Sequence, residues 1–417
     1  MRILLVNVHS GCNLGDLAIL QATLRGLREV YGDVQITVAV NHPSSLVQFP
    51  EIECLGSFTS WVERVVDGRF RGRIAQMPVY AVLLLLAALL FRLTRRRLTF
   101  GSREQRRLLE AYYEADLVLS CGGGYFFAYK PLSPFFVWAL AALAFPLALG
   151  KRVVMLPQSI GPIGGRLNRA LACQVLGRVG SVMLREPNSA AYLAKTLGVS
   201  RPQVVLPDLA FSLAAPCPLH PREEAGNRKR PRVGVTVIDW AAQTRSFGRQ
   251  AAYEEALVGL LVRLSQRYDA RVEVFSQSFG PTVDQDDRAA AGRLYDRLSS
   301  IIADVVLGAD FDDPAAIMGA YSGLDLLIGS RMHAAILGLC VGVPVLVVGY
   351  QPKAAGMMAL LGLERYCLDI EGVTVERLEG LALELLDDGG SARALIAERV
   401  ARAQRTASTW TRYLRAG

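Results

Sequence analysis

Residues able to bind anions and move protons gather in one short segment of the second half of the chain. Ser330, Arg331 and His333 leave a predicted strand and begin a predicted helix, and Lys353 follows the next predicted strand. Arginine offers a planar fork to a carboxylate or phosphate, and the helix dipole adds to it. Histidine is suited to proton transfer near neutral pH, although a core role is the alternative for a lone histidine. The pattern predicts a site for a small polyanionic substrate, with Ser330 as a candidate helix cap.

A second candidate segment follows the first predicted strand and contains Asn13, Gly15 and Asp16. Glycine here permits a tight loop with free amides at a helix N-terminus, which favours anions. Asp16 either caps the helix or accepts a proton from, or orients, a substrate hydroxyl. The G-x-G-x-x-G pattern of dinucleotide-binding proteins is absent.

Further candidates stand where other predicted strands end. They are Gly122, Gly123, Gly124, Tyr125, Gln158, Ser159 and Arg185. Consecutive glycines at a strand end favour close backbone approach to a ligand, with a simple tight turn as the alternative. Arg185 is placed either to contact a ligand or to serve as an ion-pair partner.

Strands that alternate with helices are predicted to position these candidate residues. Strands are predicted at 3–8, 35–40, 117–120, 152–156, 182–185, 204–205, 232–238, 271–276, 324–328 and 344–348. Helices are predicted at 16–30, 168–178, 253–267, 286–302, 313–322, 332–339, 375–386 and 392–414. Such alternation indicates parallel sheets with functional loops at the carboxyl ends of the strands. The predicted fold is two doubly wound, Rossmann-like α/β domains facing a cleft.

Length and composition support two domains. The chain has 417 residues, of which 52% are hydrophobic and 20% charged, which excludes disorder. The predicted N-terminal domain is 1–213, the linker is the Pro-rich and charged stretch 214–231, and the C-terminal domain is 232–417, with its last helix long enough to reach back over the first domain. Seven cysteines without a C-x-x-C pair indicate neither a disulfide scaffold nor a zinc site. A reducing cytoplasmic compartment and no bound metal are expected.

The net charge of +8 is a local feature. Residues 64–107 contain eleven arginines against two acidic residues, so the remainder is close to neutral and no nucleic-acid partner is indicated. The arginines flank an apolar run at 79–91, too short to span a bilayer of roughly 30 Å. We expect this run to contact the inner face of the plasma membrane, with a buried helix as the alternative. A second apolar run, 135–149, predicts a buried helix between two strands.

The motifs together resemble the polysaccharide pyruvyl transferase family over roughly residues 1–360. The matching blocks are NLGD (13–16), GGGYF (122–126), PQSIGP (157–162), REPNS (185–189), PDLAF (207–211), SRMH (330–333), GVP (342–344) and YQPK (350–353). The resemblance implies a fold of the GT-B glycosyltransferase type. The insertion at 62–107 departs from the compact family pattern and suits a lipid-linked acceptor.

Members of that family move the pyruvyl group of phosphoenolpyruvate onto two hydroxyls of a sugar, forming a cyclic ketal on a cell-surface glycan. The resemblance therefore implies phosphoenolpyruvate as co-substrate, without a further cofactor. It assigns Arg331 and His333 to the donor site with Arg185 as a further anion contact, and Lys353 matches a basic family position. On this hypothesis His333 is the acid that protonates C3 of the donor, and Asp16 is a base or an acceptor-orienting group.

Two other functions compete with this one. A GT-B glycosyltransferase with a nucleotide-sugar donor could use the same helix N-terminus for a diphosphate, but no acidic residue that would recognise a ribose stands out after His333. A catalytically inactive scaffold at the membrane surface would not need Arg331, His333 and Lys353 together.

Overall fold

The structure is a computed structural model that divides into two compact units. It describes residues 1–66, 69–72, 74–131, 133–200, 203–213, 230–244, 247–387 and 390–414. The first unit comprises Met1–Gly11, Ile19–Leu209 and Ser408–Gly417, and the second comprises Cys12–Ala18 and Ala210–Ala407. The segment that opens the first helix therefore groups with the second unit, and the chain end with the first.

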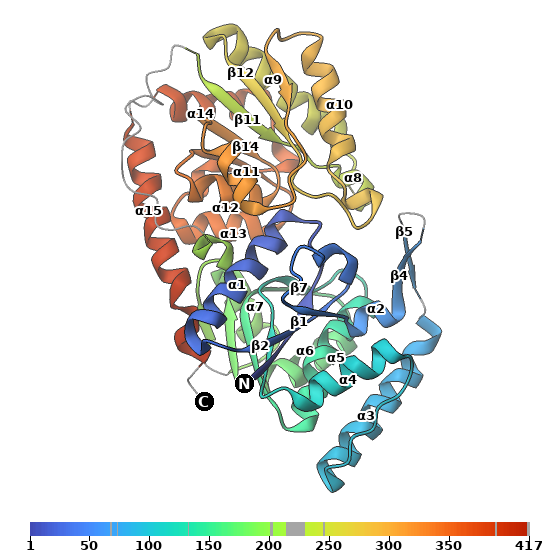
Figure 1. The fold of residues 1–417 in the computed structure, drawn as a ribbon. Coiled ribbons are helices and arrows are strands. Elements are labelled where there is room, and N and C mark those ends of the chain that lie inside the picture. The colour runs from blue at the N-terminus through green and yellow to red at the C-terminus, as the bar shows by residue number, and fades with distance from the viewer. Residues whose placement is uncertain are drawn as a thin grey trace. The chain divides into compact units, whose positions relative to one another are not determined.

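The first unit is built on a parallel sheet (Figure 1). Its strands are β1 (Arg2–Val8), β2 (Gln35–Val40), β3 (Glu53–Gly56), β6 (Leu117–Ser120), β7 (Gly123–Ala128), β8 (Arg152–Ile163), β9 (Ser181–Leu184) and β10 (Gln203–Val205). The order is β10-β9-β8-β6-β1-β2-β3, and β7 pairs with β8. The interior strands are buried on both faces, as expected where helices cover both sides of a parallel sheet.

The helices of the first unit differ in how deeply they are buried. They are α1 (Leu14–Tyr31), α2 (Phe58–Val62), α3 (Met77–Thr94), α4 (Arg103–Glu114), α5 (Pro134–Leu149), α6 (Arg166–Leu176) and α7 (Pro187–Lys195), and a short hairpin is formed by β4 (Glu63–Val66) and β5 (Arg69–Gly72). Helix α5 is largely buried, as predicted. Helix α3 is not, so the alternative of a buried helix for 79–91 is wrong.

The second unit repeats the architecture. Its sheet has the order β13 (Val305–Leu307), β12 (Arg271–Phe275), β11 (Arg232–Thr236), β14 (Leu326–Gly329), β15 (Val345–Gly349) and β16 (Cys367–Asp369), all parallel. Its helices are α8 (Trp240–Gln243), α9 (Gln250–Tyr268), α10 (Arg288–Ser299), α11 (Pro314–Tyr321), α12 (Met332–Cys340), α13 (Pro352–Leu361), α14 (Val375–Asp387) and α15 (Ser391–Ala407). The strand order reverses between β11 and β14, which is where such sheets bind ligands.

The predicted fold class is confirmed, because each unit is a parallel α/β sheet. Two expected loops are instead part of the sheet. Residues 157–162 continue β8, and the glycines at 123 and 124 begin β7. The predicted final helix ends at Ala407 and continues as a 3-10 helix, Ser408–Leu414. Most of the predicted linker, 214–229, lies outside the described residues.

Candidate active site

The candidate site of the second unit lies at the carboxyl ends of its central strands. Thr236 ends β11, Ser330 follows β14 directly, and Tyr350 follows β15. Because β11 is hydrogen-bonded to β14 and β14 to β15, these ends are adjacent. The sequence prediction that Ser330, Arg331 and His333 leave a strand and enter a helix is correct.

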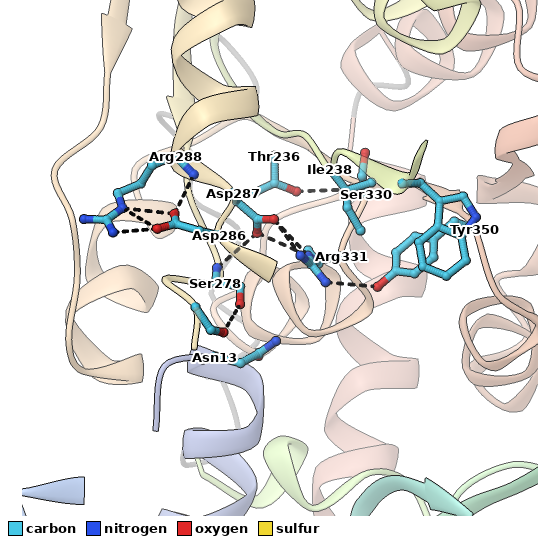
Figure 2. A network of polar contacts seen from close by, with 12 residues as sticks. Asn13, Thr236, Ile238, Ser278, Asp286, Asp287, Arg288, Ser330, Arg331 and Tyr350 are labelled. Carbon is cyan, nitrogen blue, oxygen red and sulfur yellow. Dashed lines mark hydrogen bonds and ion pairs between the residues drawn. The ribbon is translucent and has the colours of Figure 1, made fainter. Parts of the chain in front are cut away.

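Arg331 is held by a buried carboxylate (Figure 2). Its Nε and Nη2 donate to the two oxygens of Asp287 at 3.1 and 2.6 Å, and its Nη1 donates to the Tyr350 hydroxyl at 3.4 Å. The second hydrogen on each Nη makes no hydrogen bond to a described residue. Burial opposes the charged form of Arg331, but the Asp287 carboxylate outweighs it and raises the pKa of the guanidinium. Arg331 is therefore a fixed, permanent cation.

Asp287 is the orienting residue that sequence reasoning missed. It is 2% exposed, and its Oδ2 accepts the Ser278 N–H at 3.0 Å. Burial raises its pKa, against the opposing effect of Arg331. The predicted helix 286–302 includes Asp287 as an ordinary helical residue, whereas the helix begins at Arg288. The sequence feature that could have drawn attention to Asp287 is the pair of aspartates, Asp286 and Asp287, at the start of this helix.

Ser330 is buried and does not cap the helix, contrary to the prediction. Its N–H donates to the Thr236 hydroxyl at 3.1 Å, and its own hydroxyl lies 2.6 Å from that of Tyr253. The N-cap residue of α12 is Arg331, without a side-chain capping bond. Burial raises the pKa of Tyr253, so the phenol stays protonated and can donate to Ser330. Ser330 ties β14 to β11 and to α9.

His333 packs against the first turn of α1. A Cβ built on Gly15 would lie 2.0 Å from both Cγ and Nδ1 of His333, which is too close for any real side chain. The loop before Gly15 is pinned to the same unit, because Leu14 N–H donates to Gln277 O at 3.2 Å and Phe279 N–H donates to Cys12 O at 2.8 Å. The structure thus brings together Gly15 and His333, which lie more than 300 residues apart in the sequence.

Asn13, not Asp16, caps helix α1. The Asn13 Oδ1 accepts the N–H of Gly15 at 2.8 Å and that of Asp16 at 3.4 Å. The capping alternative for Asp16 is therefore wrong, and its half-buried carboxylate sits in the first turn of the helix. Its role toward a substrate hydroxyl stays a prediction.

Lys353 occupies the first turn of α13, directly after β15, and is half-buried. Tyr350, in the same connection, contacts Arg331 and lies with its ring centroid 4.5 Å from that of Trp240. Arg331 and His333 thus stand at the start of α12, after β14, and Lys353 at the start of α13, after β15. They are the two cations and the histidine expected to serve one site.

Arg185 and Ser159 of the first unit belong to a buried network of ion pairs and hydrogen bonds. Arg185 is 3% exposed, and its Nη1 pairs with Asp208 Oδ2 at 2.6 Å while its Nε donates to Ser159 Oγ at 2.6 Å. The Ser159 hydroxyl donates to Glu186 at 3.0 Å. Arg185 is therefore an ion-pair partner in this structure, which is one of its two predicted roles. A donor contact by Arg185 stays a prediction.

The local backbone requires glycine at two positions of the glycine run. A Cβ on Gly122 would lie 3.0 Å from the Pro157 carbonyl oxygen, and Gly123 has a φ of +133°. Gln158 is fully buried and donates from Nε2 to the Cys121 carbonyl. Tyr125 is 5% exposed and stacks on Phe135, with centroids 5.6 Å apart.

Two histidines beside Tyr125 are not among the predicted site residues. The His9 ring lies 5.9 Å from the His42 ring and 6.4 Å from the Tyr125 ring. His9 follows β1 and His42 follows β2, whereas Tyr125 lies within β7. Burial, and then the neighbouring His9, lowers the pKa of His42 to about 4. His42 is therefore neutral at physiological pH. Both histidines follow predicted strands, which is the signal that could have found them.

Within the described part of the chain, no group of three or more His, Cys, Asp or Glu side chains could hold a metal ion. The site residues above are a guanidinium, an imidazole, an amine and hydroxyls. Such a set binds an anion and transfers protons.

Solved structures of sugar-metabolising enzymes share the fold. Sucrose-phosphate synthase from Thermosynechococcus elongatus superimposes with a TM-score of 0.59 at 12% identity, covering 99% of this chain and 97% of that one. UDP-GlcNAc 2-epimerase from Neisseria meningitidis, solved bound to UDP-GlcNAc, gives a TM-score of 0.55 at 12% identity, covering 99% and 98%. At this identity the likeness shows the fold alone: two parallel-sheet α/β domains of the GT-B type.

The family follows from the sequence comparison. The polysaccharide pyruvyl transferase family matches residues 13–352, so the chain belongs to that family. The amylovoran biosynthesis protein AmsJ of Erwinia amylovora is 26% identical over 404 residues, covering 89% of each chain. The protein is thus a transferase of polysaccharide biosynthesis, and the resemblance drawn from its motifs is confirmed.

Proposed function

We propose that this protein transfers the pyruvyl group of phosphoenolpyruvate onto two hydroxyls of a sugar in a cell-surface polysaccharide or its lipid-linked precursor, and that it acts on the cytoplasmic side of the membrane. The observation that carries this proposal is the permanent cation Arg331 two residues before His333, at the carboxyl end of β14 in a member of this family. A guanidinium fixed by Asp287 keeps N–H donors for a carboxylate or phosphate. The adjacent imidazole supplies a proton.

In the proposed reaction, His333 in its protonated form gives its proton to C3 of phosphoenolpyruvate. C2 becomes an oxocarbenium-like centre, which the first sugar hydroxyl attacks while its proton returns to His333. The C2–O bond to phosphate then breaks with its electron pair on phosphate. The second hydroxyl attacks C2, and its proton goes to the departing phosphate. The products are a cyclic ketal and inorganic phosphate.

The other site residues bind and orient in this scheme. Arg331, Lys353 and the Ser330 segment hold the donor carboxylate and phosphate and offset the charge that develops on the leaving group. Asp16, in the first turn of α1, orients an acceptor hydroxyl or accepts its proton. Arg185 is assigned as a further anion contact by family resemblance alone, and the acceptor contacts are assigned to the loops of the first unit.

Calorimetric titration with phosphoenolpyruvate tests the donor without knowledge of the acceptor. We expect binding that is lost in Arg331→Ala. Because that change leaves Asp287 buried without its partner, Arg331→Lys is the second variant, which keeps the charge and removes the fork. Arg288→Gln is the matched control: Arg288 is adjacent to Asp287 in the sequence but pairs with Asp286 at 2.5 Å. Unchanged binding in both Arg331 variants would contradict the assignment.

UDP-sugars form the second arm of the titration, since a protein of the same fold was solved bound to UDP-GlcNAc. Binding of a UDP-sugar without binding of phosphoenolpyruvate would favour the glycosyltransferase alternative. With an acceptor in hand, we expect His333→Ala to abolish turnover and to retain donor binding. Retained turnover would remove His333 from the acid role.

A further inference from the structure

Helix α3 exposes an unusually apolar surface. Six of its side chains show between 49% and 83% of their surface: Val79, Val82, Leu85, Leu86, Leu89 and Leu93. Their spacing follows the helical repeat, so they form one continuous stripe along the helix. No charged residue occurs between Met77 and Phe91. A stripe of this kind marks an interaction surface.

The opposite face of α3 is firmly attached to the first unit. Leu84, Ala87 and Ala88 are buried in its core. Near the N-terminus of the helix, the Tyr80 ring lies 5.3 Å from that of Trp61, and at the other end the Phe91 ring lies 5.1 Å from that of Tyr113. Figure 1 shows α3 as an outer helix of this unit, beside α4.

This attachment decides between crossing a membrane and lying on it. The helix has 18 residues and is long and apolar enough to cross a membrane. It is therefore longer than the apolar run at 79–91, which by itself is too short to span a bilayer. A crossing helix has to be surrounded by lipid or by other membrane-spanning segments. One face of α3 instead packs on the α/β core of the first unit through Leu84 and Ala87. Only the exposed stripe is available to lipid, which indicates an orientation in the plane of the interface.

Arginines stand near both ends of α3. Arg92 lies in its last turn, and Arg95, Arg96 and Arg97 follow it. Arg103 and Arg106 are at the start of α4, where Gln105 donates to the hydroxyl of Tyr80 in the first turn of α3 at 3.1 Å. Arg97 pairs with Glu114 at 3.0 Å, whereas Arg96, Arg103 and Arg106 form no ion pair with a described residue. Arginines beside an apolar face match anionic headgroups above acyl chains. They would repel the same arginines on a second copy of the chain.

We propose that α3 docks this protein on an anionic membrane surface, with its apolar stripe among the headgroups and upper acyl chains and its arginines on the phosphates. The proposal depends on neither the donor nor the acceptor of the transfer reaction. A protein bound in this way would encounter a lipid-linked sugar by diffusion along the membrane surface.

Flotation with lipid vesicles tests the proposal, using phosphatidylcholine with or without phosphatidylglycerol. We expect the full-length protein to float with the anionic vesicles, and high salt to weaken this binding. The variant Leu85→Gln/Leu86→Gln/Leu89→Gln should bind on the order of a hundredfold more weakly. Arg95→Gln and Arg96→Gln should each reduce binding roughly fivefold at low salt.

The matched control replaces three equally apolar and exposed side chains of the second unit, as Val283→Gln/Ile301→Gln/Leu307→Gln. It should bind as the parent does. Binding that survives the triple leucine change would overturn the proposal. So would resistance of the bound protein to alkaline carbonate extraction, which indicates a crossing helix. Self-association that the triple change abolishes, without vesicle binding, would assign the stripe to a second copy of the chain.

Discussion

The contact between Gly15 and His333 offers the sharpest test of the site geometry. A Cβ at position 15 would lie 2.0 Å from the imidazole Cγ and Nδ1 and 2.3 Å from the His333 Cβ. Ordinary carbon contacts need about 3.5–4 Å. In Gly15→Ala the ring must therefore move by about 1.5 Å. Overpacking of this kind costs about 1–3 kcal/mol of unfolding free energy, and a displacement of about 1 Å in a reacting group costs about a hundredfold in rate.

Denaturant unfolding and the transfer assay measure the two effects separately. Gly292→Ala in α10 is the matched control, because nothing lies within 4 Å of its added Cβ. It should be neutral or stabilising by about 0.5–1 kcal/mol. The destabilisation by Gly15→Ala should largely vanish in a His333→Gly background, which removes the three atoms nearest to the added Cβ. Equal costs in both backgrounds, or full activity of Gly15→Ala, would refute the placement of His333 against α1.

Two further predictions concern buried charge. Asp287→Asn leaves the Arg331 guanidinium without its carboxylate, so it should lower the free energy of unfolding by about 3–5 kcal/mol and weaken donor binding; a change below about 1 kcal/mol would contradict the buried pair. The pKa of His42 is lowered from 6.5 to about 4, so between these pH values the unfolded state binds more protons and stability falls with falling pH. His42→Gln should remove this part of the pH dependence. Because the ring is partly exposed, we expect the effect on the free energy of unfolding to be about 1–2 kcal/mol. Unfolding curves recorded across that pH range measure it. An unchanged pH profile would show that His42 titrates normally.

The sequence predicts the elements that position the site because their patterns are local. Short β-branched runs separated by helical stretches place β11, β12, β14 and β15 within a few residues of their observed bounds. The carboxyl ends of parallel strands then have to lie together at one edge of the sheet. Local patterns alone therefore suffice to assign Ser330, Arg331, His333 and Lys353 to one region.

Sequence reasoning fails where a residue's environment depends on distant partners. Gln158 and Ser159 are predicted to lie in a loop, but they belong to strand β8, which pairs with β7. Their side chains form hydrogen bonds to buried partners there. Asp287 is hidden inside a predicted helix because its pairing with Arg331 spans 44 residues. The position of an isolated carboxylate in a sequence does not reveal its salt-bridge partner.

The sequence by itself determined the fold class, the family and the strand ends that carry the chemistry, since all three depend on local order and composition. Tertiary structure alone decided that Asp287 fixes Arg331, that Gly15 makes room for His333, and that α3 turns an apolar face to solvent. The physical reason is that these are contacts and exposures set by packing between segments far apart in the chain. A helix of leucines has the same sequence whether one face of it is covered or not.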